Sequence, residues 1–465
     1  MSNPGTADNP LRVAVVGCGP SGFYVADAVL KTPGLVVQVD MFDRLPTPYG
    51  LVRYGVAPDH QEVKRVTKVY AKTAEHPSVR WFGGVEFGKH LTMDDVRAHY
   101  HAVAFTTGAQ TDRRLDIPGE DLQGSHPATQ FVAWYNGHPD CRHLSFDLST
   151  ERAVVIGVGN VAIDVARMLC RTPDELAKTD IADYALEALR KSRVREVLLV
   201  GRRGPAQAAF TNSEVEEVGD LADADAVARP DEVALDEVTK ADLAAHPDRQ
   251  TDLKLKFLTK YAEPRALSKS KRLVFRFLLS PTKIHGDASG RVSGVTLVRN
   301  VLSAGADGSI KAKATGQTEE VSAGLVFRSV GYRGVALPGV PFREDWGTIP
   351  HEAGRVVDLA SKAPVTGAYV AGWIKRGPSG VIGTNRACAV ESVKSLAADL
   401  AAGKLLAPSA PRDAVTALLK GRGVSWVTFP EWSKVEALEV ARGAAAGRPR
   451  VKFCSPEEIV AAARV

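Results

Sequence analysis

The stretch that decides the fold is Gly17-Cys18-Gly19-Pro20-Ser21-Gly22, which directly follows the apolar run Leu11 to Val16. A short apolar run of this kind is typical of a strand buried in a parallel sheet. In a turn of this spacing the first glycine allows a sharp bend, the second lets the backbone approach a pyrophosphate, and the third allows close helix–strand packing. We call residues 17–22 the first glycine turn. It predicts a strand–turn–helix unit that binds a dinucleotide at the helix N-terminus.

A second apolar run, Leu35 to Phe42, ends at Asp43. An acid at the end of the second strand accepts the hydrogens of a ribose diol in dinucleotide-binding units. The alternative is a solvated residue at a strand end. The intact glycine turn before it favours the ribose role.

A second turn of the same type, Gly157-Val158-Gly159-Asn160-Val161-Ala162, follows the run Ala153 to Ile156. We call it the second glycine turn. The next predicted strand, Glu196 to Val200, is followed by Arg202 and Arg203 rather than by an acid. Two guanidinium groups bind a 2′-phosphate that a carboxylate would repel, so NADP(H) is preferred over NAD(H). The alternative is a pair of ordinary exposed arginines. Two nucleotide sites in one chain indicate a flavoprotein oxidoreductase.

Composition sets broad limits on the protein. The chain has 465 residues, of which 45% are hydrophobic and 24% charged, as in a globular protein of two or three domains. No apolar stretch approaches membrane-spanning length, and Met1 to Pro10 lacks the layout of a secretion signal, so we expect a cytoplasmic protein without membrane insertion. The net charge of +5 does not indicate nucleic-acid binding, but it suits an acidic protein partner.

The cysteines exclude several redox sites. The five residues contain no C-x-x-C pair: they are Cys18, Cys141, Cys170, Cys388 and Cys454. This argues against a disulfide framework, an iron–sulfur cluster and a redox-active dithiol, and no metal site is predicted. Electrons that reach a flavin in this chain must leave by another route.

Three longer motifs are more specific than the glycine turns: Pro48 to His60, Gly201 to Pro205 and Gly372 to Asn385. With the second glycine turn, they resemble the adrenodoxin reductase family, and in particular its actinobacterial ferredoxin–NADP reductases. The resemblance implies an α/β protein with two Rossmann-like domains of the glutathione reductase and adrenodoxin reductase type. An FAD domain formed by residues 1–110 and 326–465 would contain an inserted NADP domain, residues 111–325.

The resemblance also implies cofactor-binding positions. Trp373 stands where related flavoproteins usually have Asp, and the helix-like run Ala387 to Ala402 would direct positive potential at the flavin, unless it is a plain core helix. The implied FAD-binding residues are Gly17, Gly19, Pro20, Gly22, Asp43, Leu51, Val85, Trp373, Gly380, Val381 and Ile382. The implied NADP-binding residues are Arg113, Gly157, Gly159, Asn160, Val161, Arg202, Arg203, Glu214 and Gly380.

His60 and Glu217 match an active-site pair of the family. An imidazole beside a carboxylate stays protonated to higher pH and could orient the nicotinamide or relay a proton. His60 could instead be a structural histidine after the Pro58-Asp59 turn, and Glu217 part of a solvated acidic helix face.

The implied activity is hydride transfer from NADPH to N5 of FAD, followed by single-electron transfer to a ferredoxin. The alternatives are an NADPH reductase that serves a quinone or a larger enzyme, and a non-catalytic protein that senses dinucleotides. Charge alone suggests a ferredoxin docking patch, although a solvated face fits equally; its residues are Arg265, Lys269, Lys271 and Arg272. The acidic, alanine-rich stretch Asp220 to Gln250 predicts a surface excursion of the NADP domain. Trp426 and Trp432 are expected to pack the C-terminal helices onto the FAD domain.

Overall fold

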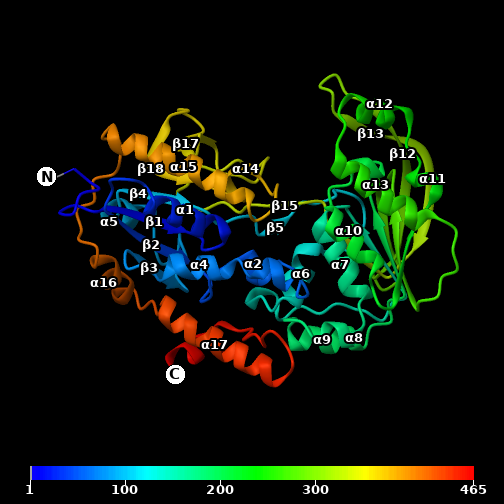
Figure 1. Cartoon of the computed structure of the whole chain (residues 1–465), viewed down its shortest axis with the longest axis horizontal. Helices are drawn as coiled ribbons and strands as arrows, with labels where there is room; N and C mark the ends of the chain where they lie inside the picture. The colour runs from blue at the N-terminus through cyan, green and yellow to red at the C-terminus, as the bar shows by residue number, and fades with distance from the viewer. Residues whose placement is uncertain (1–2) are drawn as a thin grey trace. The chain divides into compact units, whose positions relative to one another are not determined.

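The computed structural model describes residues 3–465, and the chain divides into two compact units (Figure 1). The first unit contains the described residues up to Val56, then His60–Thr111 and Gly331–Val465. The second contains Ala57–Asp59 and Asp112–Val330. The chain passes between the units at β5 (Thr111–Asp112) and β15 (Tyr332–Arg333), which pair with each other.

The first unit is built on a seven-stranded sheet in the order β16-β17-β18-β4-β1-β2-β3. Its strands are β1 (Leu11–Val16), β2 (Val37–Asp43), β3 (Val79–Gly83), β4 (Ala102–Phe105), β16 (His351–Glu352), β17 (Arg355–Val357) and β18 (Pro364–Val370). The five strands from β18 to β3 run parallel, and β16 and β17 add an antiparallel edge. Val13 and Val15 belong to one apolar cluster and Ala14 and Val16 to another. Since successive side chains point to opposite faces, β1 is buried on both, as its apolar run predicts.

The helices of the first unit come from both ends of the chain. They are α1 (Pro20–Leu30), α2 (Leu51–Tyr54), α3 (Gln61–Lys64), α4 (Thr67–Ala74), α5 (Met93–His99), α14 (Trp373–Arg376), α15 (Thr384–Ala401), α16 (Ala414–Gly421), α17 (Phe429–Ala445) and α18 (Pro456–Arg464). Helices α1 and α15 pack against each other and lie side by side in Figure 1. The helix predicted over 387–402 is α15, which begins three residues earlier than predicted, at Thr384.

The C-terminal helices pack onto the first unit through aromatic side chains, as predicted. Trp432 of α17 is fully buried in the apolar cluster that contains α1 and α15. Trp426, just before α17, packs against the cluster on the opposite face. Phe429 contacts Trp81 of β3 with ring centroids 6.4 Å apart.

The second unit is built on a six-stranded parallel sheet in the order β6-β14-β7-β8-β10-β9. Its strands are β6 (Ser125–Pro127), β7 (Arg152–Ile156), β8 (Glu196–Val200), β9 (Ala224–Ala228), β10 (Lys271–Arg276) and β14 (Leu325–Arg328). An antiparallel sheet of β11 (Leu279–Gly286), β12 (Val292–Ala304) and β13 (Ile310–Ser322) packs on it through one apolar cluster. Both predicted glycine turns thus follow a buried parallel strand.

The α-helices of the second unit are α6 (Ala128–Tyr135), α7 (Asn160–Cys170), α8 (Pro173–Leu176), α9 (Asp183–Arg190), α10 (Asn212–Gly219), α11 (Pro230–Val233), α12 (Glu237–Ala245) and α13 (Arg249–Ala262). The expected surface excursion over 220–250 was wrong in one part. Residues Ala224–Ala228 form β9, which pairs with β10 and completes the parallel sheet, because its small side chains fit beneath α13. Over residues 3–465, no helix has the length and apolar character needed to cross a membrane.

Candidate functional site

The first glycine turn leaves an open helix start. Gly19 is the N-cap of α1 and Pro20 its first residue; no side chain caps this end, and its first turn contains no acid. Gly17 has φ +98°, and a Cβ on Gly22 would lie 2.2 Å from the carbonyl oxygen of Gly17, so both positions need glycine. A Cβ on Gly19 would meet only the Cα of Gly50, at 3.9 Å. No side chain of the protein therefore occupies the first amides of α1, as the binding of a pyrophosphate there requires.

Asp43 ends β2 beside this turn. Its carboxylate accepts the backbone N–H of Cys18 at 2.8 Å and that of Leu45 at 3.0 Å. Burial raises the pKa of Asp43, and these two amides act in the opposite direction. The turn thus fixes the carboxylate in place, and its role toward a ribose stays a prediction.

The other residues predicted for the first cofactor also belong to the first unit. Gly372 has φ +82°, and a Cβ there would lie 2.0 Å from Ser21 Oγ, so the start of α14 at Trp373 lies against the first glycine turn. Leu51 follows Gly50 at the start of α2, and buried Val85 donates its N–H to the Asp43 carbonyl at 2.8 Å. Gly380, Val381 and Ile382 lie in the segment between α14 and α15.

The second glycine turn has the same open form. Gly157 has φ +129°, and Gly159 is the N-cap of α7, again with no capping side chain and no acid in the first helical turn. Val161 lies in that turn. Asn160 accepts the backbone N–H of Thr211 through Oδ1 at 2.9 Å, which ties the turn to the start of α10. This helix start also suits a phosphate.

Arg202 and Arg203 follow β8 and face no acid. Neither guanidinium forms an ion pair within the described residues. Burial lowers the pKa of Arg203, and the charge of Arg202 lowers it further. Their carbonyl oxygens accept Asn300 Nδ2 at 2.8 Å and the Leu278 N–H at 3.1 Å, so the peptide is fixed. Two cations that repel each other on a fixed backbone match a bound phosphate. Arg113, after β5, is exposed, as is Arg202, whereas Arg203 is half-buried.

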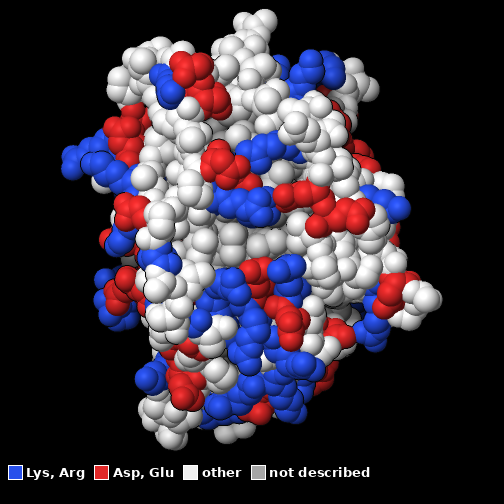
Figure 2. Space-filling model, turned by 90° about the vertical axis from the view of Figure 1, so that its right-hand side faces the viewer, with Lys and Arg blue, Asp and Glu red and all other residues white. Residues whose placement is uncertain are grey.

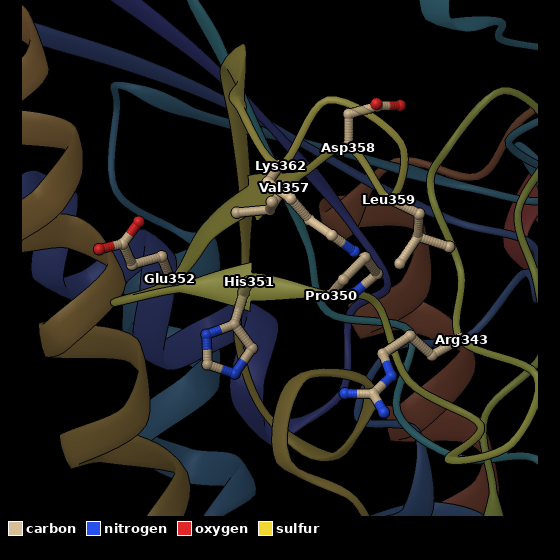
Figure 3. Close-up of a pocket in the computed structure, with 8 residues that line it drawn as sticks. All are labelled: Arg343, Pro350, His351, Glu352, Val357, Asp358, Leu359 and Lys362. Atoms are coloured by element: carbon tan, nitrogen blue, oxygen red, sulfur yellow. The ribbon is translucent and has the colours of Figure 1, made fainter.

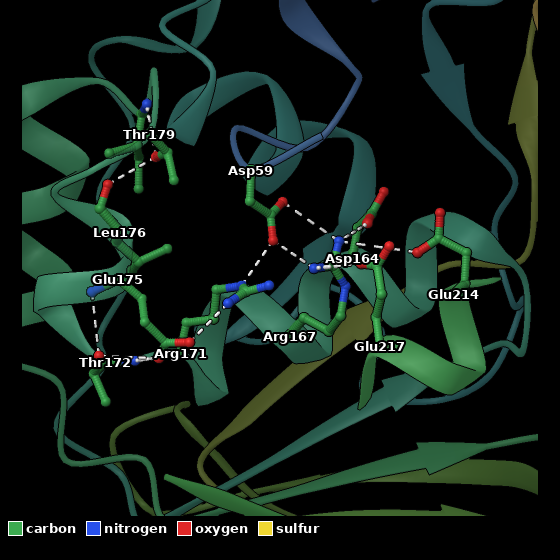
Figure 4. Close-up of polar contacts among 11 residues, drawn as sticks. Asp59, Asp164, Arg167, Arg171, Thr172, Glu175, Leu176, Thr179, Glu214 and Glu217 are labelled. Carbon is green, nitrogen blue, oxygen red and sulfur yellow. Dashed lines mark hydrogen bonds and ion pairs between the residues drawn. The ribbon is translucent and has the colours of Figure 1, made fainter. Parts of the chain in front are cut away.

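A charge cluster lies beside the second glycine turn, and its centre, Arg167, was not among the predicted site residues (Figure 4). Arg167 of α7 is completely buried. Its guanidinium lies 2.5 Å from Asp59, 2.8 Å from Asp164, 3.3 Å from Glu217 and 3.9 Å from Glu214. Burial by itself lowers the pKa of Arg167, but Asp59 and Asp164 outweigh it and raise the pKa.

The cluster fixes the two predicted acids of α10 relative to α7. The spacing of Asp164 and Arg167, three residues apart on the helix after the turn, was the available sequence signal. No sequence signal indicated the contact between Arg167 and Asp59, which are more than a hundred residues apart.

A separate hollow in the first unit contains none of the predicted residues (Figure 3). It measures about 470 Å³, and its lining residues are Arg343, Pro350, His351, Glu352, Val357, Asp358, Leu359 and Lys362. In Figure 3 the Arg343 and His351 side chains lie near each other, while the Glu352 and Asp358 carboxylates point away from them.

Comparisons with known proteins give the family. Residues 11–209 match the family model described as pyridine nucleotide-disulphide oxidoreductase. The chain is 47% identical over 460 residues to NADPH-ferredoxin reductase FprA of Mycobacterium tuberculosis, covering 97% of this chain and 98% of that protein. It is 42% identical over 465 residues to human mitochondrial NADPH:adrenodoxin oxidoreductase, covering 98% and 92%. The chain belongs to the adrenodoxin reductase family.

A solved structure of the family agrees with the fold. The structure of M. tuberculosis FprA in complex with NADPH superposes with a TM-score of 0.91 at 45% identity, covering 98% of this chain and all of that one. The predicted fold class, two dinucleotide-binding sheets in one chain, is therefore confirmed.

The pair of residues carried over from the adrenodoxin reductase family falls in different units. His60 is the N-cap of α3 in the first unit, and Glu217 lies on α10 in the second. Their pairing stays a prediction.

The predicted docking patch was wrong at Lys271. Its side chain is only 8% exposed, and Nζ donates to the Leu169 carbonyl at 2.9 Å, because β10 runs between two other strands. Burial also lowers the pKa of Lys271. Arg265 and Arg272 are exposed and Lys269 partly so. We call these three residues the basic patch.

Proposed function

We propose that this chain is an FAD-dependent NADPH:ferredoxin oxidoreductase. FAD supplies the chemistry, since a flavin can take two electrons from NADPH and release them singly to an iron–sulfur protein. The observation that carries the proposal is the pair of open glycine turns. One stands beside an acid and the other beside two arginines without an acidic partner.

Each unit would hold one cofactor. In the first unit the amides at the start of α1 would bind the FAD pyrophosphate, and Asp43 would accept ribose hydrogens. In the second unit the start of α7 would bind the NADP pyrophosphate, and Arg202, Arg203 and Arg113 would contact phosphate. The residues present fit both groups, because a Cβ at Gly19 or Gly159 would meet no atom closer than 3.9 Å.

An anaerobic titration with NADPH, repeated with NADH, tests the proposal. A yellow protein whose flavin absorbance bleaches with NADPH at far lower concentration than with NADH is expected. A colourless protein that does not take up FAD would contradict the proposal and favour a dinucleotide sensor. A yellow protein that reduces quinones but no ferredoxin would favour the other reductase class.

The partner is expected to dock at the basic patch. Figure 2 looks onto the side of the molecule where α11, β12 and β13 lie in Figure 1, and Lys and Arg gather in the lower part of that view. Opposite charge accelerates the encounter with an acidic ferredoxin, and salt screens it. The basic patch supplies exposed cations at Arg265 and Arg272 for this purpose.

Charge reversal tests the docking site. The double variant Arg265→Glu/Arg272→Glu should slow ferredoxin reduction at low salt by about tenfold while leaving reduction of a small dye unchanged. The matched control is Lys191→Glu/Arg193→Glu, which makes the same change in charge at exposed residues of the second unit. Equal slowing by both double variants would show only a long-range effect of net charge.

A further inference from the structure

Arg376 and Asn385 lie where three segments of the first unit meet. Arg376 is the last residue of α14 and Asn385 the second of α15. Residues 377–383, which we call the flavin segment, join the two helices and contain Gly380–Ile382. None of the roles proposed above uses Arg376 or Asn385.

The Arg376 guanidinium forms hydrogen bonds across the flavin segment, from the end of α14 to the start of α15. It donates to the Ser379 carbonyl and to Thr384 Oγ1, both at 3.0 Å, and to Asn385 Oδ1 at 3.2 Å. Its acceptors are all uncharged, and no ion pair to Arg376 occurs in the part of the chain that the structure describes. A planar fork of five N–H donors can hold several acceptors in fixed geometry, which an ammonium group cannot.

Asn385 connects the flavin segment to the first glycine turn. It is 7% exposed. Its Oδ1 also accepts the hydroxyl of Ser21 at 3.0 Å, and its Nδ2 donates to the Ile382 carbonyl at 3.1 Å. Ser21 is the residue against which Gly372 packs so closely that a Cβ would not fit. One buried amide thus ties together the first glycine turn, the approach to Trp373 and the flavin segment.

The first amides of α15 are bonded within the flavin segment, since those of Thr384, Asn385 and Arg386 donate to the Val381, Ile382 and Gly383 carbonyls at 3.1, 3.2 and 3.1 Å. No side chain caps this helix at Gly383, and its first turn contains no acid. Arg376 adds hydrogen bonds to the oxygens of Ser379, Thr384 and Asn385 around the same turn, so the start of the helix is ordered. The positive end of an ordered helix favours negative charge on a bound flavin.

We infer that Arg376 and Asn385 are positioning residues that hold the flavin segment against the first glycine turn, and so set the affinity for FAD and the potential of the bound flavin. The inference rests on the proposed function. The fork geometry of Arg376, and not its charge alone, carries the effect.

Four variants test it: Arg376→Gln, Arg376→Lys, Asn385→Ala and the control Arg386→Gln. Arg386 is an exposed arginine in the same helical turn, so its removal changes the charge without changing the link. The measurements are the FAD dissociation constant of the deflavinated protein, from flavin fluorescence, and the midpoint potential of the bound flavin. Losing hydrogen bonds to a charged donor should weaken FAD binding about tenfold or more and make the potential more negative in the first three variants. Arg386→Gln should match the wild type.

Full recovery of FAD affinity and potential in Arg376→Lys would overturn the inference, since charge alone would then suffice. Wild-type values in Arg376→Gln would overturn it as well. An unchanged urea midpoint, followed by the fluorescence of tryptophans in the first unit, shows that a variant is folded, and Ser21→Ala tests the same link if Arg376→Gln does not fold. A wild-type protein that binds no FAD would contradict the proposed function itself, whereas a yellow wild type with unaffected variants would contradict only this inference.

Discussion

At the scale of single residues, Arg203 is the clearest indication of cofactor choice. It is half-buried beside Arg202, and burial and this neighbour both lower its pKa. A dianionic 2′-phosphate would relieve both effects, because it supplies opposite charge and several acceptor oxygens. The free protein therefore carries an unfavourable arrangement that the preferred cofactor would remove.

Arg203→Ala should raise the Michaelis constant for NADPH about tenfold or more, since a hydrogen bond to a charged group contributes about 1.5–3 kcal/mol. The constant for NADH should change little, because NADH lacks the 2′-phosphate. Steady-state rates with a dye acceptor measure both constants. Arg195→Ala, at an exposed arginine of the same unit, is the control. Equal increases for NADPH and NADH would remove the assignment of a 2′-phosphate site.

At the scale of elements, a buried ion pair joins the C-terminal helix α17 to α2. Arg53 and Glu439 lie 2.6 Å apart with side chains 3% and 0% exposed. The Arg53 guanidinium also lies 4.9 Å from the Trp432 ring centroid, and Glu439 accepts the Phe453 N–H at 2.9 Å. Gly50 is the N-cap of α2, and a Cβ on it would lie 3.0 Å from the Cα of Gly19. The C-terminal region thus supports the helix whose first residue, Leu51, we propose as a wall of the first cofactor site, a role that its sequence did not reveal.

Glu439→Gln should lower the free energy of unfolding by about 3–5 kcal/mol, because it leaves the Arg53 charge buried without its carboxylate. Denaturant unfolding followed by tryptophan fluorescence measures the change. The matched control is Glu436→Gln on the same helix, whose partner Arg450 is partly exposed. That substitution should lower the free energy of unfolding by about 1 kcal/mol or less. Similar losses in the two variants would mean that burial of the pair is not what matters.

At the scale of the whole molecule, each unit contains a histidine whose pKa is lowered by burial. Burial lowers the pKa of His101 in the first unit to about 4, with a smaller effect from Arg12. Burial likewise lowers the pKa of His126 in the second unit to about 4, with a contribution from Arg328. The unfolded chain, with a histidine pKa near 6.5, binds these protons more readily. Their contribution to stability is therefore complete above pH 6.5 and is lost as the pH falls toward 4.

We expect the free energy of unfolding to fall between pH 6.5 and 4, and the fall to be shallower in His101→Gln and in His126→Gln. Urea unfolding at a series of pH values measures the slopes. The test compares the slopes of the unfolding free energy against pH and not its absolute values, because each substitution also changes packing. Unchanged slopes in both variants would show that the buried histidines do not carry the acid sensitivity.

Much of the fold followed from local sequence. The glycine turns, the apolar runs before them and the start of β8 at Glu196 were all predictable, because a turn with positive φ and a buried strand each demand particular residue types at short spacing. Strand β9 was not predicted, because its five residues include three alanines and an acid and so show little apolar pattern. The burial of Lys271 was not predicted either, because a lysine in a charged run is expected to be exposed, and only the position of its strand inside the sheet buries it.

The sequence by itself predicted two dinucleotide-binding units and the preference for a phosphorylated cofactor, because these depend on residues within a few positions of the end of a buried strand. Only the tertiary structure decided which distant side chains hold those turns in place. Asp59 with Arg167, Arg53 with Glu439, and Asn385 with Ser21 are each separated by more than a hundred residues. Such pairs leave no periodic pattern in the chain; they are selected when the sheets bring their elements together and burial makes an unpaired charge or amide too costly.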